Sequence, residues 1–446
     1  MKKILIFTLC AMLFSACANK FDDKIKQVNT KQFQSTEQNW WKIYNNKTLN
    51  TLVQQMLENN SQITSARYAF LSAVSRYKLI NFDMYPKLSA NLAANLARDL
   101  NLGTRSNSFS NALNLSYELD IYGKVADEKS AAQFNANASF YELESLQLSL
   151  INSTINNGFE LIYFNDVEKL LKEYIQNLEE SKRIYTLKYQ LGRVEELDLL
   201  NIEQSLLNAK QNLLSNEQNK ELVIKNLKDL LGKKENFNSI ENLMKLSLKD
   251  FNKPSVDFNV SLDILAKRPD VRSKLNSLNA AFKDYKSMQK SMYPSLSLGG
   301  SLSGNANELN QSFKLLNLGG TLQISLPFLD YGRVKQNIQI SQFAYENLKS
   351  SYEQALQSAI NEFYLCFKDY EFNTKLHENI QIINSKQELI TNAYLRKYEL
   401  GRAELKDYLD AKNSFISSSQ EILRSKLNLL KTINSYYQIT TINADE

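Results

Sequence analysis

The sequence predicts a mainly α-helical membrane protein, internally duplicated, that contributes a few β-strands to a barrel shared with other chains. Three observations predict this fold class. The 446 residues include only 12 Gly and 5 Pro, which favours long uninterrupted helices. The motif Tyr-x-Leu-Gly-Arg occurs at 189–193 and again at 398–402, and the same offset of 209 residues separates Gly123 from Gly332. In each half, a pair of segments with alternating apolar residues precedes the long helices.

Residues 1–16 are predicted to be a signal peptide. They begin with Lys2 and Lys3 and continue in an apolar run that is too short to span a bilayer. The segment that ends at Cys17 resembles a bacterial lipobox, in which the cysteine is lipidated and becomes the new N-terminus. The following Ala18 is compatible with sorting of such a lipoprotein to the outer membrane. An ordinary Ala-x-Ala cleavage site at the same place is the alternative.

The remaining elements follow in two copies. Residues 17–60 are expected to form a lipidated leader and a first helix, with the aromatic side chains of Trp40, Trp41 and Tyr44 as anchors. The first repeat is predicted at 61–232, with a helix, a strand pair at 85–122 and a long helical hairpin at 124–231. A linker at 233–267 is expected to form an equatorial region. The second repeat is predicted at 268–440, with a helix, a strand pair at 293–331 and a helical hairpin at 333–439. A short tail, 441–446, ends the chain.

The strand pairs are predicted from a period of two. Apolar residues, most of them leucine, alternate with mainly polar or acidic residues in 88–96 and 113–121, and again in 296–302 and 322–326. Strands of this length with one apolar face are typical of membrane barrels. For either pair alone, a half-buried hairpin of a soluble protein is the alternative. Four strands cannot close a barrel in lipid, so the sequence predicts that several chains share one barrel.

The helical hairpins are the longest predicted elements. Residues 125–191 contain one glycine, and as a continuous helix these 67 residues would measure about 100 Å. Gly192, Arg193 and Gly401 are predicted at the tips, where each hairpin turns. The apolar positions follow helical spacing, which favours coiled-coil pairing. A solid periplasmic coiled-coil scaffold would have the same periodicity.

Composition excludes several classes of function. The formal charge of +5 is spread over interleaved residues of both signs, so no nucleic-acid partner is expected. Three cysteines and one histidine offer neither a disulfide framework nor a set of metal ligands. We expect His377 to face solvent on a helix. With no nucleophile and base at a motif spacing, the sequence predicts no enzyme and no cofactor apart from a lipid on Cys17.

The order of these motifs resembles the TolC-type outer-membrane efflux channels, in particular the lipidated branch that works with resistance-nodulation-division pumps. The motifs that carry the resemblance are the lipobox-like Cys17, Trp40-Trp41 with Tyr44, Arg268-Pro269-Asp270-Val271, the paired Tyr-Pro-x-Leu-Ser, Asp330-Tyr331-Gly332-Arg333 and the two Tyr-x-Leu-Gly-Arg turns. The resemblance implies a homotrimer with a shared barrel of twelve strands that continues into an α-helical tunnel in the periplasm. It also implies a periplasmic adaptor protein, an inner-membrane pump and the lipid of the outer membrane as partners.

A gate is expected at the periplasmic end of the tunnel. Asp407 and Asp410 are three residues apart and share a helix face, so a trimer would carry two acidic rings. Ordinary first-turn acids that favour the helix dipole are the alternative. The resemblance implies that these aspartates form the constriction and that Tyr398 bonds to Asp198. Arg402 directly follows the turn glycine, one position earlier than in well-known members, so its partner is left open.

The leading functional hypothesis is therefore a passive, gated exit duct of a multidrug efflux pump. The sequence has no Met-rich or His-rich cluster for metal ions, which favours organic compounds as substrates. Export of metal ions or of proteins is the alternative within the channel class. A periplasmic scaffold or adaptor lipoprotein is the alternative in another class, although an adaptor usually has a single helical hairpin.

Overall fold

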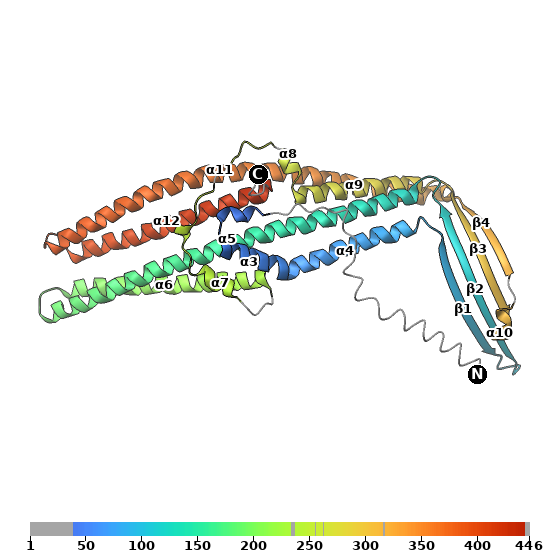
Figure 1. Ribbon diagram of the computed structural model, residues 1–446, viewed down its shortest axis with the longest axis horizontal. Helices are drawn as coiled ribbons and strands as arrows, with labels where there is room; N and C mark the ends of the chain where they lie inside the picture. The colour runs from blue at the N-terminus through green and yellow to red at the C-terminus, as the bar shows by residue number, and fades with distance from the viewer. Residues whose placement is uncertain (1–38, 233–236, 255, 262, 315–316, 442–446) are drawn as a thin grey trace. The chain divides into compact units, whose positions relative to one another are not determined.

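The computed structural model describes residues 39–232, 237–254, 256–261, 263–314 and 317–441 (Figure 1). The predicted signal peptide, Cys17 and residues 442–446 lie outside these ranges. The elements in chain order are η2 (Trp40–Tyr44), α3 (Lys47–Asn59), α4 (Ser61–Phe82), β1 (Lys87–Arg98), β2 (Arg105–Leu119), α5 (Lys124–Gln190), α6 (Glu196–Leu231), α7 (Asn238–Leu243), η3 (Leu248–Asp250), α8 (Asp263–Ala266), α9 (Pro269–Lys290), β3 (Ser295–Ala306), α10 (Leu309–Ser312), β4 (Asn317–Ser325), η4 (Pro327–Asp330), α11 (Tyr331–Glu399) and α12 (Leu405–Thr440). Among the described helices, none has the length and apolar content needed to cross a bilayer.

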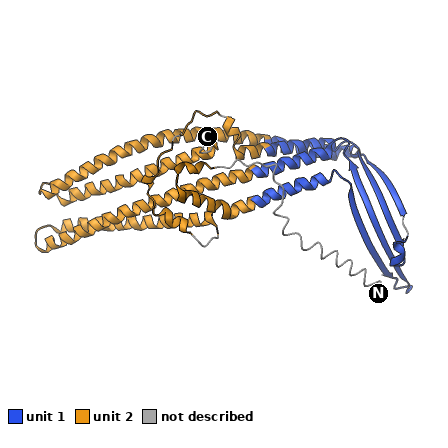
Figure 2. Ribbon diagram, in the orientation of Figure 1, with its two compact units in different colours: residues 1–37, 67–140, 276–348 blue, residues 38–66, 141–275, 349–446 orange. Residues whose placement is uncertain are grey.

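The chain divides into two compact units, shown in different colours in Figure 2. Unit 1 takes its described residues from 67–140 and 276–348, and unit 2 takes them from 39–66, 141–275 and 349–441. Each unit therefore contains segments from both halves of the sequence. The strands all belong to unit 1, and the turns between the long helices belong to unit 2.

Unit 1 contains one antiparallel sheet with the strand order β1-β2-β3-β4 (Figure 1). The register pairs Leu88 with Leu115 and Leu113 with Leu302, and it pairs Leu302 with Leu318. Since side chains alternate between the two faces of a strand, this register places the leucines of all four strands on one face. Their side chains are largely exposed in the single chain, as Leu92 at 71% and Leu322 at 64% illustrate.

The connection between β3 and β4 contains the short helix α10, which packs against β2 and β3. The side-chain amide of Asn111 donates to the backbone oxygen of Ser312 at 2.9 Å, and Ser312 is buried. The helix α10 is therefore held against the sheet by these contacts. The periodicity of the sequence predicts the two strands, but it does not predict the helix between them.

The helical part of unit 1 is held by charged contacts between α5 and α9. Asp127 lies in the first turn of α5 and pairs with Lys283 at 3.0 Å and with Lys290 at 2.6 Å. Near the start of the same helix, Tyr122 stacks on Tyr293 with 4.8 Å between ring centroids. These contacts join the start of α5, in the first repeat, to α9 and the end of that helix, in the second repeat.

Unit 2 has a large apolar core built around α3 and the long helices. Leu49 and Leu52 of α3 are fully buried. Gly158 is the single glycine of α5, and a Cβ atom at its position would lie 3.3 Å from a methyl group of Leu49. The glycine therefore allows α3 to approach α5 closely. Trp40, also fully buried, stacks on Tyr437 of α12 with 5.8 Å between ring centroids.

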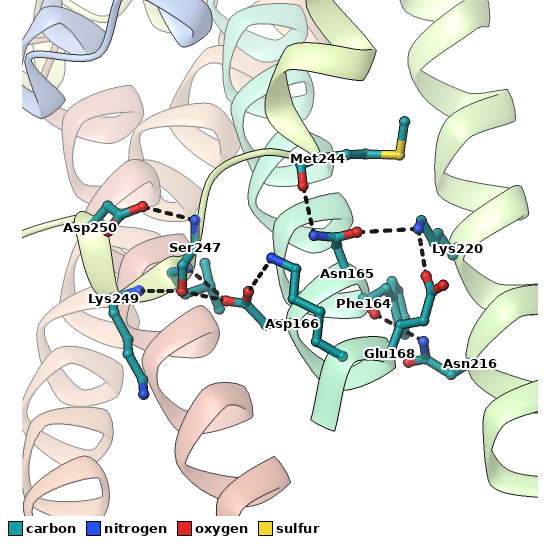
Figure 3. Close-up of polar contacts among 12 residues, drawn as sticks. Phe164, Asn165, Asp166, Glu168, Asn216, Lys220, Met244, Ser247, Lys249 and Asp250 are labelled. Carbon is teal, nitrogen blue, oxygen red and sulfur yellow. Dashed lines mark hydrogen bonds and ion pairs between the residues drawn. The ribbon is translucent and has the colours of Figure 1, made fainter. Parts of the chain in front are cut away.

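The linker between the repeats is fixed to α5 by a polar network (Figure 3). One carboxylate oxygen of Asp166 accepts hydrogen bonds from the hydroxyl of Ser247 at 2.8 Å and from the backbone N–H of Leu248 at 2.9 Å. On the same helix, the amide of Asn165 donates to the backbone oxygen of Met244 at 2.7 Å (Figure 3). Because Leu248 is fully buried, these bonds satisfy backbone groups that would otherwise lack partners.

Candidate functional site: the helix-turn tips

The two turns at the tips have the same backbone construction. Gly192 has a φ of +68° and Gly401 a φ of +69°, values in the left-handed region that favours glycine. At each turn, the N–H of the following arginine donates to a carbonyl five residues earlier: Arg193 to Lys188 at 2.9 Å, and Arg402 to Lys397 at 2.8 Å. This geometry ends a helix and satisfies its last carbonyl groups. Gly192, Arg193 and Gly401 therefore lie in the turns between the long helices.

Asp407 and Asp410 are exposed on the first turns of α12. The carboxylate of Asp407 accepts a hydrogen bond from the backbone N–H of Glu404 at 3.2 Å, and Glu404 is the N-cap of the helix. Asp407 therefore caps its own helix, and its place in the first turn also suits the interaction with the helix dipole that is the alternative from the sequence. Asp410 is also exposed, and its carboxylate makes no side-chain hydrogen bond within the described residues.

Tyr398, near the end of α11, is half-buried and contacts α5. Its hydroxyl lies 2.6 Å from the hydroxyl of Tyr185, and the ammonium nitrogen of Lys188 lies 3.4 Å from the same atom. The ring of Tyr398 also stacks on Tyr408 of α12, with 6.3 Å between centroids. Tyr398 therefore contacts both the other helix of its own hairpin and the first hairpin.

The structure gives Tyr398 a different partner from the one that the resemblance implies. In the described part of the chain, no hydrogen bond joins Tyr398 to Asp198. Asp198 lies in the first turn of α6 and is half-buried, while the hydroxyl of Tyr398 is directed at Tyr185 on α5. Burial, the hydrogen bond to Tyr398 and the negative charge of Asp198 together raise the pKa of Tyr185. Asp198 therefore belongs to the surroundings of this pair but is not bonded to it.

The arginines at the tips have exposed side chains. Within the described residues, neither Arg193 nor Arg402 forms an ion pair, so the partner of Arg402 is not identified within one chain. The leucines that precede the glycines, Leu191 and Leu400, are each 69% exposed. The tips thus present polar backbone, one arginine and one apolar side chain each.

A seam of polar contacts joins α5 to α12 above the tips. Four contacts follow one another with increasing distance from the tips. Tyr174 donates to Asn413, Lys431 pairs with Glu160, Asn434 donates to Asn156 and Asn152 donates to Gln438. As the number on α5 falls, the number on α12 rises, so the two helices run antiparallel. Three of these four contacts lie between residues 152 and 160 of α5, and the seam is sparser toward the tips.

His377 differs from the expectation. It does not face solvent fully, because it is half-buried and its Nδ1 atom lies 2.8 Å from the hydroxyl of Ser425 on α12. Burial lowers the pKa of His377, and the positive charges of Lys426 and Lys253 lower it further. Among the described residues, no group of three or more His, Cys, Asp or Glu is arranged to hold a metal ion.

Sequence analysis missed Tyr185 and Lys188. Tyr185 is buried among the apolar residues of a long helix, and its partner Tyr398 is 213 positions away. Helical spacing marks Tyr185 as an inward-facing residue, but it cannot reveal a contact with another hairpin. In the sequence, the Tyr-x-Leu-Gly-Arg motif that begins at Tyr398 marks one member of this pair, but no motif marks Tyr185.

Comparisons with known proteins add an independent line of evidence. The family described as outer membrane efflux protein matches residues 52–233 and 260–440, one segment in each half of the chain. The chain is similar to the toxin and drug export protein A of Aggregatibacter actinomycetemcomitans, with 29% identity over 447 residues that cover 98% of this chain and 97% of the relative. It is also 24% identical to the cation efflux system protein CusC of Escherichia coli O157:H7, over 90% of this chain and 87% of that protein.

The fold is also found among solved structures. The structure of the Campylobacter jejuni CmeC outer membrane channel aligns with a TM-score of 0.82 and 24% sequence identity, over 95% of this chain and 92% of that one. The open-state MtrE outer membrane channel of Neisseria gonorrhoeae aligns with a TM-score of 0.80 and 20% identity, over 92% and 94%. These alignments confirm the predicted fold class, which is a duplicated, mainly helical chain with a small sheet.

Proposed function

The chain belongs to the outer membrane efflux protein family, and on that premise we propose that it is the exit duct of a tripartite multidrug efflux pump, a passive trimeric channel gated at its periplasmic end. Members of the family are channels and not enzymes, so transport depends on the shape and charge of the passage. The observation that carries the proposal is the combination of an open four-stranded sheet and two long helical hairpins in one chain.

The open sheet supports assembly with other copies. β1 and β4 are its edges, and each has one side without a partner strand in the described chain. Because the four strands alternate in direction, β4 of one copy would run antiparallel to β1 of the next and could pair with it. An unpaired strand edge is not tolerated in lipid, so closure requires further copies. Three copies give the twelve strands that the resemblance implies.

We place the gate at the tips of the hairpins. Three copies of Asp407 and of Asp410 would form two acidic rings that attract cations and narrow the opening. Tyr398, Asp198 and Arg402 surround this region, and Gly192, Arg193 and Gly401 form the turns that a periplasmic adaptor would meet. In the same proposal, Cys17 carries a covalent lipid that anchors the chain to the outer membrane, with the helices in the periplasm.

The substrate class rests on the relatives. The name of the Aggregatibacter relative refers to both toxin and drug export, and that relative matches along nearly the whole chain. We therefore propose organic compounds as the principal substrates and export of a protein toxin as a second candidate. CusC carries the name of a cation efflux protein, but its identity to this chain is lower.

Deletion of the gene in its own host tests the function. The proposal predicts increased accumulation of a fluorescent pump substrate such as ethidium and lower resistance to drugs, with both restored by the intact gene. The proteins secreted by the same strains are compared as well, because loss of a secreted protein in the deletion strain would indicate export of a protein toxin. Unchanged accumulation, resistance and secretion in the deletion strain would contradict an exit duct of either kind.

A further inference from the structure

The contact between the two hairpins near the tips consists of three side chains. Tyr185 of α5 is buried at 5% exposure, and its hydroxyl lies 2.6 Å from that of Tyr398 on α11. Lys188 lies one turn further along α5. Its ammonium nitrogen is 3.4 Å from the Tyr398 hydroxyl and 4.8 Å from the centre of the Tyr185 ring. We name these three residues the tyrosine–lysine clasp.

The interactions within the clasp stabilise the state in which the two hairpins are in contact. A buried hydroxyl without a partner costs free energy, and here each tyrosine satisfies the other. The face of a tyrosine ring carries partial negative charge, so an ammonium group above it is attracted to it. Lys188 thereby contacts both tyrosines, and the pair needs no carboxylate to hold it.

The clasp lies close to the tips, where few other polar contacts join the two hairpins in the described chain. The polar seam between α5 and α12 is densest between residues 152 and 160 of α5. Between that region and the tips, the polar contacts that join the two hairpins in the described chain are Tyr174 with Asn413 and the clasp itself. The clasp is the one nearest the tips, where separation of the hairpins would widen the opening.

Tyr398 also connects the clasp to the acidic residues of α12. Its ring stacks on Tyr408, which lies between Asp407 and Asp410 in the sequence. This contact places the clasp directly beside the start of α12, which carries the two aspartates.

We infer that Tyr185 and Lys188 are positioning residues of the gate, which hold Tyr398 against the first hairpin and so stabilise the closed channel. This inference rests on the proposed function and deepens it. It assigns the restraint to two residues of α5, whereas the resemblance implies Asp198 on α6. Loss of either contact should release the second hairpin without altering the wall of the duct.

Single-channel recording of the purified full-length trimer in planar bilayers tests the inference. Tyr185→Phe removes one hydroxyl, and Lys188→Gln removes the ammonium group. Each should shorten the closed dwell time about fivefold, the factor that corresponds to one ordinary hydrogen bond. Tyr189→Phe and Lys406→Gln are matched controls, because both side chains are exposed, and each should match the wild type. Lys188→Arg keeps the charge and should restore most of the closed time.

A double-mutant cycle distinguishes the clasp from a general structural effect. If Tyr185 acts through Tyr398, then Tyr185→Phe should have little further effect in a Tyr398→Phe background. Additive effects, or closed times equal to those of the controls, would overturn the inference while the channel itself remains. If the wild-type trimer forms no channel, the proposed function fails instead. The two substitutions address the clasp separately, so failure of one variant to assemble leaves the other to decide.

Discussion

Gly192 and Gly401 adopt φ values of +68° and +69°, although 209 residues separate them in the sequence. Each glycine follows a helix of nearly seventy residues and precedes a return helix of 36 residues. An added Cβ atom would meet nothing within 4 Å at either position. The glycines are therefore required by the backbone conformation and not by crowding.

Replacement of a tip glycine should lower the free energy of unfolding through backbone strain, without a steric clash. We expect Gly401→Ala to lower the free energy of unfolding by about 1 kcal/mol, because L-residues are strained in the left-handed region. Gly332→Ala is the control, since Gly332 lies within α11 without a positive φ and also has open space around it. That substitution should leave stability unchanged or raise it. Equal losses in chemical unfolding of the two variants would contradict this explanation.

Removal of the acidic pair should alter conduction. We expect Asp407→Ala combined with Asp410→Ala to raise single-channel conductance and to weaken block by divalent cations, because the acidic rings would be lost. Asp407→Asn with Asp410→Asn is the matched variant, since the amide oxygen can still accept the hydrogen bond from Glu404 that caps α12. Both double variants should behave alike. Conductance equal to the wild type would remove these residues from the gate.

The half-buried His377 should make the stability of the fold depend on pH. Its pKa is lowered in the folded chain by burial and by Lys426 and Lys253, so protons bind the unfolded chain more readily. The stability contribution is complete above the ordinary histidine pKa of about 6.5 and is lost progressively as the pH falls below it. Thermal unfolding at pH 7.5 and 5.5 measures this loss. His377→Gln should reduce the difference between the two midpoints, and an identical difference would contradict the prediction.

The attachment of the linker depends on Asp166. We expect Asp166→Ala to lower the free energy of unfolding by about 2 kcal/mol, because the substitution leaves the buried N–H of Leu248 without its charged acceptor. It should also increase protease cleavage in the linker. Lys169→Ala is the control, since the Lys169 side chain is 60% exposed and such an ion pair contributes little. A linker that stays equally protected in both variants would show that other contacts hold it.

The sequence predicts the elements well where a short-range pattern defines them. The alternation of apolar with polar or acidic residues predicts one apolar face across β1 to β4, and the two Gly-Arg pairs lie in the two turns between long helices. The expected helix at 125–191 compares with α5 at Lys124–Gln190. In each case the structure is determined by residues that are close in the sequence, either through the side-chain period or through the conformation of a glycine.

What the sequence could not supply depends on contacts between distant segments. The partner of Tyr398 is set by how the two hairpins pack, and the hydrogen bond of His377 joins it to Ser425 of a different helix. The role of Gly158 follows only once Leu49 is seen beside it. The sequence offers Asp407 as a first-turn acid that favours the helix dipole, but the hydrogen bond that it accepts from the backbone N–H of Glu404 is visible only in the structure.

The central claim is that several copies of this chain close one barrel in the outer membrane. Outer-membrane fractions, extracted in mild detergent and run without heating, measure assembly and location together. The account predicts a band of three chains that converts to a single chain on heating. A water-soluble single chain, recovered without detergent, would contradict it.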